Sequence, residues 1–232
     1  MAKKVQTVFV CQNCGYESPR WMGRCVCGAW NSFVEEKVGE DKHDSRRRTG
    51  RTSVTESGKT SSGRPVPLSH VKSGETDRID TGIPEFNRVL GGGLVRGSLT
   101  LISGEPGIGK STLILQAASN IAACCGKVLY VSGEESEEQI KIRADRICGN
   151  LSENLYILSE TNMENVLTQF AAIRPVFMII DSIQTMYTEN LDSAPGSVSQ
   201  VRDCGAALMK AGKENGTPIL IVAHVTKSGE LA

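Results

Sequence analysis

The chain has 232 residues, and its 26 Lys and Arg residues balance 26 Asp and Glu residues, so the formal net charge is zero. This length fits one substantial α/β core with a small appended module, and the balanced charge gives no global reason to expect binding to nucleic acid or to a membrane surface. The start MAKKVQTVFV lacks a secretory signal and no run approaches the roughly 20 apolar residues of a membrane span, so we expect a soluble, cytoplasmic protein without a membrane partner.

The first segment, residues 1–35, has four closely spaced cysteines and too few apolar side chains to fold by burial alone. Cys11 and Cys14 form a CxxC knuckle, whereas only one residue separates Cys25 from Cys27. Because cytoplasmic thiols stay reduced, we expect the four thiolates to bind one Zn²⁺ in a zinc ribbon with a strained second knuckle. The alternative is a degenerate knuckle, in which one thiol of the second pair is not a ligand.

The second segment, residues 36–75, is rich in Ser, Thr, Gly and Arg and has no apolar periodicity, so we expect a flexible linker. Its one histidine near the ribbon, His43, is a poor substitute metal ligand. The linker also carries a basic cluster of Arg46, Arg47, Arg48 and Arg51. This cluster is either a phosphate-binding arm or a solvated part of the linker, and the second meaning is the commoner one.

The third segment, residues 76–232, alternates short apolar runs with stretches of helical period. The expected strands are Ser98–Ser103, Lys127–Ser132, Leu155–Leu158, Val176–Asp181 and Pro218–Ala223. The expected helices are Lys110–Cys124, Glu135–Ile147, Asn162–Ile173 and Ser199–Asn215. This order predicts an α/β fold with a parallel sheet and helices on both faces.

The sequence GEPGIGKST follows the first of these strands and opens a helix, which is the context of a GxxxxGK[ST] phosphate loop. Its glycines let successive backbone N–H groups face an anion, Lys110 reaches the β and γ phosphates, and the Ser111 hydroxyl is placed for Mg²⁺. A second glycine run, GGGL at residues 91–94, has no lysine and is interpreted as a turn. The expected residues for ATP and Mg²⁺ are Gly104, Glu105, Pro106, Gly107, Ile108, Gly109, Lys110, Ser111, Thr112 and Asp181.

Carboxylates follow two of the other strands. VFMIIDS places Asp181 at the carboxyl edge of the sheet, where it would orient the magnesium shell. The strand KVLYVS runs into GEES at the same edge, so Glu134 is the candidate general base, whereas Glu135 is expected to cap the next helix. His224 either senses the γ phosphate or is a solvated residue at a strand end.

The order CxxCG, RWMGRC, CGAWNSF, TGIPEFNRVLGGGLVRGSLTLISGEPGIGKSTLILQ, YVSGEES and IIDSIQTMYTENLDSAPGSVSQVRDC closely resembles the bacterial RadA (Sms) family of DNA repair proteins. The resemblance covers almost the whole chain. It implies a zinc ribbon followed by a RecA-like P-loop ATPase core that binds single-stranded and branched DNA and forms a homo-oligomeric ring. It also implies branch migration in homologous recombination, with the recombinase RecA and the replicative helicase machinery as partners.

Carried over by position, the resemblance makes Lys110 and Glu134 the catalytic residues, Asp181 the carboxylate on the Mg²⁺ side, and residues 186–202 the first DNA-contacting loop. Two departures limit the transfer. The family normally has CxxC in the second knuckle, and it continues past this chain's last residue with a KNRFG motif and a Lon-like domain. The chain is therefore expected to be an amino-terminal fragment that is weakly active or inactive by itself.

The leading interpretation is a DNA-dependent ATPase of recombination and repair. A rival of another class is an ATP-binding switch or adaptor that recruits a protein partner through the zinc ribbon without moving DNA. A second rival is a different RecA-type enzyme, such as a replicative helicase or a clock-type kinase, and the ribbon together with SAPGSVSQVRD disfavours it.

Overall fold

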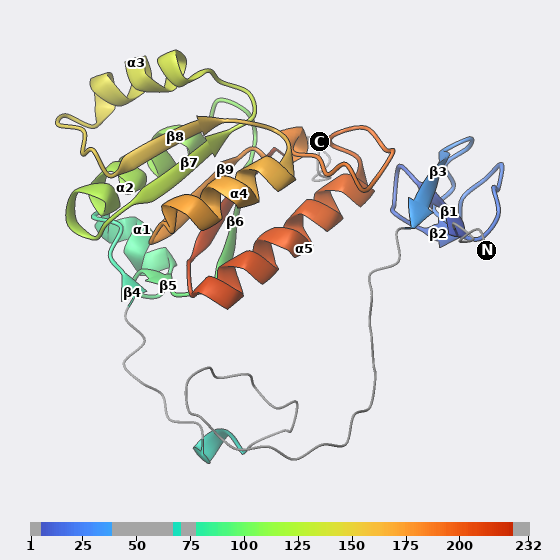
Figure 1. Cartoon of the computed structure of the whole chain (residues 1–232), viewed down its shortest axis with the longest axis horizontal. Helices are drawn as coiled ribbons and strands as arrows, with labels where there is room; N and C mark the ends of the chain where they lie inside the picture. The colour runs from blue at the N-terminus through green and yellow to red at the C-terminus, as the bar shows by residue number, and fades with distance from the viewer. Residues whose placement is uncertain (1–5, 39–66, 71–77, 225–232) are drawn as a thin grey trace.

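The computed structural model describes residues 6–38, 67–70 and 78–224 (Figure 1). Most of the expected linker lies outside these residues, and so do the arginine cluster and His43. One short 3₁₀ helix, η1 (Leu68–His70), falls within the linker range. The linker expectation therefore stays a prediction.

The amino-terminal module is a small antiparallel sheet. It consists of β1 (Gln6–Cys11), β2 (Glu17–Ser18) and β3 (Phe33–Val38), in the order β2-β1-β3. Its core is made of Cys11, Cys25 and Phe33, with Phe9, Met22 and Ala29 packed against them. This cluster is separate from those of the larger domain, so the module contributes little apolar burial and depends on its cysteines.

The larger domain is built on a five-stranded sheet. Its strands are β6 (Leu99–Gly104), β7 (Val128–Ser132), β8 (Leu155–Ser159), β9 (Phe177–Asp181) and β10 (Ile219–His224). They lie in the order β6-β10-β9-β7-β8, and every pair is parallel. The expected α/β class with a parallel sheet is confirmed.

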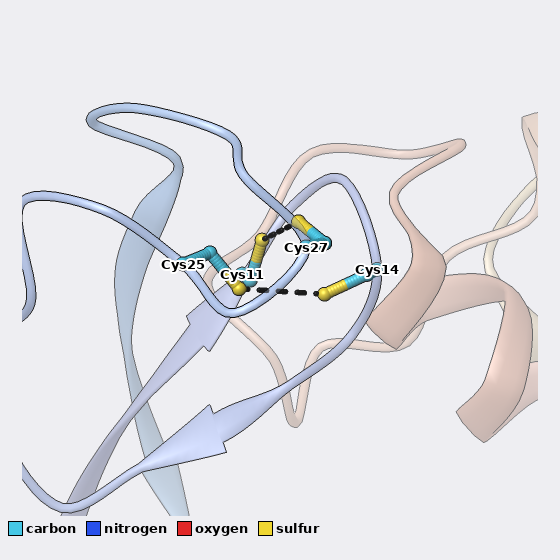
Figure 2. A group of neighbouring side chains, drawn as sticks. All are labelled: Cys11, Cys14, Cys25 and Cys27. Carbon is cyan, nitrogen blue, oxygen red and sulfur yellow. Dashed lines mark hydrogen bonds between the residues drawn. The ribbon is translucent and has the colours of Figure 1, made fainter.

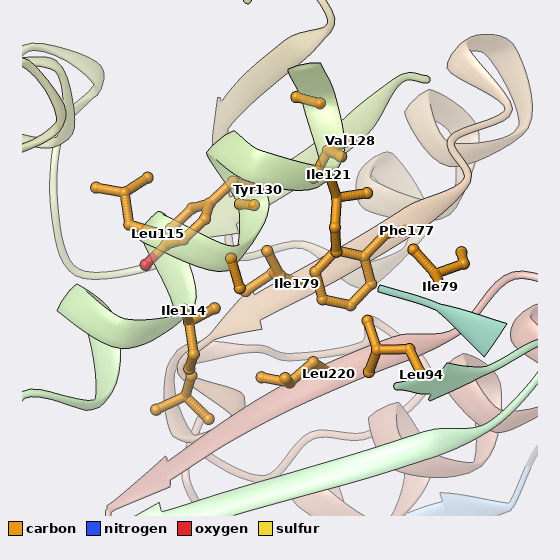
Figure 3. Close-up of a cluster of buried hydrophobic side chains, with 14 of the residues drawn as sticks. Ile79, Leu94, Ile114, Leu115, Ile121, Val128, Tyr130, Phe177, Ile179 and Leu220 are labelled. Atoms are coloured by element: carbon orange, nitrogen blue, oxygen red, sulfur yellow. The ribbon is translucent and has the colours of Figure 1, made fainter. Parts of the chain in front are cut away.

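Helices cover both faces of this sheet, as its nearly all-apolar strands predict. They are α1 (Pro84–Val89), α2 (Lys110–Cys124), α3 (Glu137–Ile147), α4 (Met163–Ile173) and α5 (Val198–Asn215). Along β7, Val128 and Tyr130 face α2 and α3 (Figure 3). Leu129 and Val131 face α4 and α5. None of the helices in the described part of the chain is long and apolar enough to cross a membrane.

A short unit precedes the phosphate-loop strand. Strands β4 (Arg78–Ile79) and β5 (Leu94–Val95) pair in an antiparallel hairpin, with α1 between them. Gly91, Gly92 and Gly93 all have positive φ and turn the chain into β5, as expected for this run. Buried Ile79 and Leu94 join the core beside α2 (Figure 3), and buried Phe86 belongs to the same cluster.

The start of α3 corrects one prediction. The helix begins at Glu137 instead of Glu135, and its cap is Ser136, whose side chain accepts a hydrogen bond from the Gln139 backbone in a capping box. Glu135 instead forms an ion pair with Arg143, 2.6 Å apart. A hydroxyl that satisfies a free helix N–H outcompetes a carboxylate that only complements the helix dipole.

Candidate nucleotide site and metal centre

The loop between β6 and α2 has the geometry of an anion cradle. Gly107 and Gly109 have φ values of 81° and 98°, a conformation that side-chain-bearing residues rarely adopt. Gly109 is also the N-cap of α2, so the unpaired N–H groups of the first helical turn face the loop. Apart from the adjoining residues of the chain, no atom of the described residues lies within 4 Å of the position a Cβ would take at either glycine, so the loop is open to a ligand.

Lys110 places its ammonium group in this loop. Its Nζ donates to the carbonyl oxygens of Gly104 and Glu105, at 2.7 and 2.9 Å, and the residue is only 7% exposed. No acidic side chain of the described residues pairs with it. A buried cation held by carbonyl dipoles alone is well suited to an anionic ligand.

Asp181 is the last residue of β9, and its carboxylate is held by a hydrogen bond from Tyr130 of β7. The Tyr130 hydroxyl donates to Oδ2 of Asp181 at 2.5 Å, and Tyr130 is fully buried. Burial, together with the Asp181 charge, raises the pKa of Tyr130 well above its usual range, so the phenol stays a donor. The contact fixes one carboxylate oxygen and leaves the other for a ligand.

Glu134 lies beside the end of β9. Its Oε1 accepts a hydrogen bond from Ser182 Oγ at 2.8 Å and lies 3.5 Å from His224 Nε2. The Glu134 side chain is about half exposed, at 49%, so water reaches it. The Ser182 hydroxyl therefore orients the Glu134 carboxylate. The carboxylate also stays accessible to solvent, as a general base that activates water requires.

The strand register brings these residues to one edge of the sheet. Gly104 pairs with His224, and Asp181 pairs with Ser132, two residues before Glu134. The phosphate loop, His224, Asp181 and Glu134 thus stand at the carboxyl ends of four adjacent strands, where ligands of open α/β sheets bind.

The four cysteines of the ribbon converge (Figure 2). Their sulfur atoms all lie within 4.8 Å of one another, with Cys11 to Cys27 at 3.9 Å and Cys14 to Cys25 at 3.5 Å. Sulfurs at the corners of a tetrahedron with metal–sulfur bonds of about 2.3 Å are about 3.8 Å apart. All four thiols therefore fit a Zn²⁺ site, and this arrangement speaks against a spectator thiol.

The backbone shows how the shorter knuckle closes. In the first knuckle, Gly15 N–H donates to the Cys11 carbonyl at 2.8 Å. In the second, Gly28 N–H donates to the Cys25 carbonyl at 2.9 Å, so the turn is one residue shorter. Gly15 and Gly28 both have positive φ, 71° and 93°. The missing residue thus tightens the turn and removes no ligand.

Several supporting residues escaped the sequence analysis. Ser32 Oγ lies 3.1 Å from Cys11 Sγ, and Asn13 Nδ2 donates to Cys27 Sγ at 3.7 Å. Tyr130 and Ser182 similarly support the nucleotide site. The only sign of such a supporting residue in the sequence was Tyr130, a tyrosine within an otherwise apolar strand.

Of the segment expected to contact DNA, residues 186–197 form a loop that leads into α5, and residues 198–202 are the start of that helix. Buried Gln200 organises it: its Oε1 accepts from Thr188 N–H at 2.8 Å, and its Nε2 donates to the Ser193 carbonyl at 3.0 Å. The ribbon reaches the same region, because Glu17 forms an ion pair with Arg202. A role of this loop in DNA binding remains a prediction.

Comparisons with known proteins match both parts of the chain. The profile of the AAA domain family matches residues 65–230, and a profile described as a rubredoxin metal binding domain matches residues 9–35. The DNA repair protein RadA of Bacillus subtilis (strain 168) is 49% identical over 230 residues, which cover 99% of this chain and 49% of the relative. RadA of Streptococcus pyogenes serotype M1 is 50% identical over 233 residues, 100% of this chain and 49% of the relative. The chain thus spans about half the length of the curated relatives it matches.

Proposed function

Because the chain belongs to the AAA domain family and is homologous to RadA proteins over its whole length, we propose that it is a DNA-dependent ATPase of homologous recombination and DNA repair. The observation that carries the proposal is the convergence of the Lys110 loop, Asp181 and Glu134 at one sheet edge. Beyond ATP hydrolysis, the proposal includes binding of single-stranded DNA, branch migration of recombination intermediates, and a cytoplasmic location.

ATP would be held by the backbone N–H groups of the loop at residues 104–112 and by the Lys110 ammonium. Ser111 and Asp181 would hold Mg²⁺, which supplies charge neutralisation at the β and γ phosphates. Glu134 accepts the proton of the attacking water, and its half-exposed position gives that water access. Ser182 keeps the Glu134 carboxylate aimed across the sheet edge.

The proposal divides the chain into a zinc ribbon (1–35), a linker (36–75) and an ATPase domain (76–232). It includes a homo-oligomeric ring, and RecA and the replicative helicase machinery as partners. It also includes slow ATP hydrolysis by this chain alone.

The test measures ATP hydrolysis with and without single-stranded DNA, for this chain and for a full-length homologue carrying the same substitutions. Lys110→Ala removes a charge that binds the phosphates, so nucleotide binding falls together with turnover. Glu134→Gln keeps the shape but removes the base, so ATP still binds while turnover falls about 10²–10⁴-fold. Glu135→Gln is the matched control, because Glu135 forms an ion pair with Arg143, and we expect only a mild effect.

Two outcomes would correct or contradict the proposal. If Glu135→Gln were inactive and Glu134→Gln hydrolysed ATP normally, the base would be the neighbouring residue, and the ATPase function would stand. If the full-length protein bound ATP but DNA never stimulated hydrolysis, the ATP-binding switch or adaptor would be the better interpretation.

A further inference from the structure

We propose that the ribbon hairpin at residues 19–31 binds single-stranded DNA by stacking its bases on Trp21 and Trp30. These are the only two tryptophans of the chain. The inference takes its ligand, DNA, from the proposed function, and it adds a binding surface that the nucleotide site does not contain.

Both indole rings are exposed to solvent. Trp21 is 54% exposed and Trp30 is 70% exposed, although tryptophan is usually among the more buried residues. The hydrophobic core of the ribbon, formed by Cys11, Cys25 and Phe33, contains neither ring. Ribbon packing therefore does not account for two large aromatic side chains on this small module.

The hairpin holds the two residues on its opposite arms. Asn31 N–H donates to the Gly23 carbonyl at 2.9 Å, and Arg24 pairs with Trp30 in an antiparallel bridge. On the other arm, the Trp21 ring lies over Gly23, where an added Cβ would be 3.7 Å from the ring. Buried Cys25 anchors the backbone of this hairpin in the ribbon core.

The charge of the hairpin favours a polyanion. Residues 19–31 contain two arginines, Arg20 and Arg24, and no acidic residue. The Arg24 guanidinium lies over one face of the Trp30 ring, 5.6 Å from its centre, so a cation accompanies the stacking residue and a base would stack on the other face. Within the described segments, no acidic side chain pairs with either arginine. Aromatic platforms flanked by cations are the means by which proteins bind single strands without sequence preference.

Single strands fit this surface better than duplex DNA does. A base can stack on an indole ring only when its own face is free, and in a duplex both faces are covered by neighbouring bases. The ribbon contacts the larger domain outside the hairpin, because Glu17 pairs with Arg202 and Gly15 approaches Val198 at the start of α5.

The experiment titrates the whole chain with oligo(dT) and with duplex DNA while tryptophan fluorescence is recorded. Because all tryptophan emission comes from the hairpin, stacking quenches it directly. Trp21→Phe and Trp30→Phe leave one emitting residue each and report on the two arms separately. Trp21→Ala and Trp30→Ala should each weaken oligo(dT) binding on the order of 5- to 150-fold. Val26→Ala is the matched control, because Val26 is 73% exposed on the same hairpin and should change nothing.

Arg24→Gln adds a second readout, the salt dependence of oligo(dT) affinity, which would not change if Arg24 only supported the structure of the ribbon. It should lower the slope of log affinity against log salt by about 0.7, the value for one phosphate contact to a single strand. Zinc content, measured for every variant, shows that the ribbon is intact. A variant that loses zinc is replaced by its phenylalanine counterpart, which keeps most of the stacking surface.

Quenching by oligo(dT) with loss of affinity in both alanine variants supports the inference. Oligo(dT) binding without quenching, and with equal affinity in the alanine variants, overturns it and places DNA elsewhere or leaves the hairpin to a protein partner. ATP hydrolysis of the full-length homologue is measured in parallel. If DNA stimulates hydrolysis normally but does not quench tryptophan fluorescence, only this inference is refuted. If DNA quenches the fluorescence but the homologue does not hydrolyse ATP, only the proposed function is refuted.

Discussion

Tyr130→Phe tests the buried support of the nucleotide site. The substitution removes one hydroxyl, which donates to Asp181 Oδ2 at 2.5 Å, and it keeps the ring that packs between α2 and the sheet. Its effect should therefore arise from the hydrogen bond and not from a lost core contact.

The size of the effect follows from the burial of the two partners. A hydrogen bond to a charged group contributes about 1.5–3 kcal/mol. Tyr130 is fully buried but Asp181 is 8% exposed, so a water molecule can partly replace the donor. We therefore expect a loss of about 2 kcal/mol of unfolding free energy, or about 4–8 °C in Tm for a chain of this size. Without the Tyr130 hydroxyl, the Asp181 carboxylate is less well oriented, so nucleotide binding should require a higher Mg²⁺ concentration.

Urea unfolding of Tyr130→Phe, Asp181→Ala and the double variant measures the coupling between the two residues. Tyr156→Phe on β8 is the matched control, because its ring is 36% exposed, and it should change stability by less than about 0.5 kcal/mol. A coupling energy near zero, or a Tyr130→Phe protein as stable as the parent, would refute the reasoning.

Further predictions concern the helix cap, the metal and an alkaline transition. Ser136→Ala removes the capping box of α3 and should cost about 1 kcal/mol in urea unfolding, whereas an unchanged midpoint would show the cap to be dispensable. Metal analysis after dialysis should find one zinc per chain, and chelation should alter the emission of the two ribbon tryptophans while the core helices keep their circular dichroism. Burial raises the pKa of Cys204 from 9.0 to about 12, so its thiol stays neutral in the fold while an unfolded thiol ionises. Stability should therefore fall by about 1.4 kcal/mol per pH unit as the pH rises from 9.0 to about 12, and Cys204→Ala should flatten that slope.

The sequence was most informative where a local signal and a global pattern coincide. Helix α2 was predicted with both of its ends, because the phosphate loop fixes its start and the apolar period continues to Cys124. The start of α3 was misplaced because GEES offers two competing signals, and Ser136 with Gln139 is the stronger one. Helix α1 was missed because six residues are too few to show a period, although Pro84 at its first turn is a typical start signal.

The candidate site divides in the same way. The loop glycines, Lys110 and the four cysteines can be found from spacing, since their chemistry requires residues close together in the chain. The contacts that orient these residues cannot be found from spacing. Tyr130 and Asp181 are 51 residues apart, and Glu134 and Ser182 are 48 apart, so only the strand order brings them together. The order β10-β9-β7 cannot be predicted from any local sequence pattern.

Strand β10 lies between the strand that leads into the phosphate loop and the strand that ends in Asp181. Two interstrand spacings of about 4.8 Å place β6 and β9 roughly 10 Å apart, so β10 sets the width of the nucleotide site. This width depends on backbone hydrogen bonds and is insensitive to the length of the surrounding connections. Insertions between strands and helices should therefore be tolerated over evolution, whereas a one-residue insertion within Ile219–His224 would exchange the two faces of the strand and misalign both halves of the site.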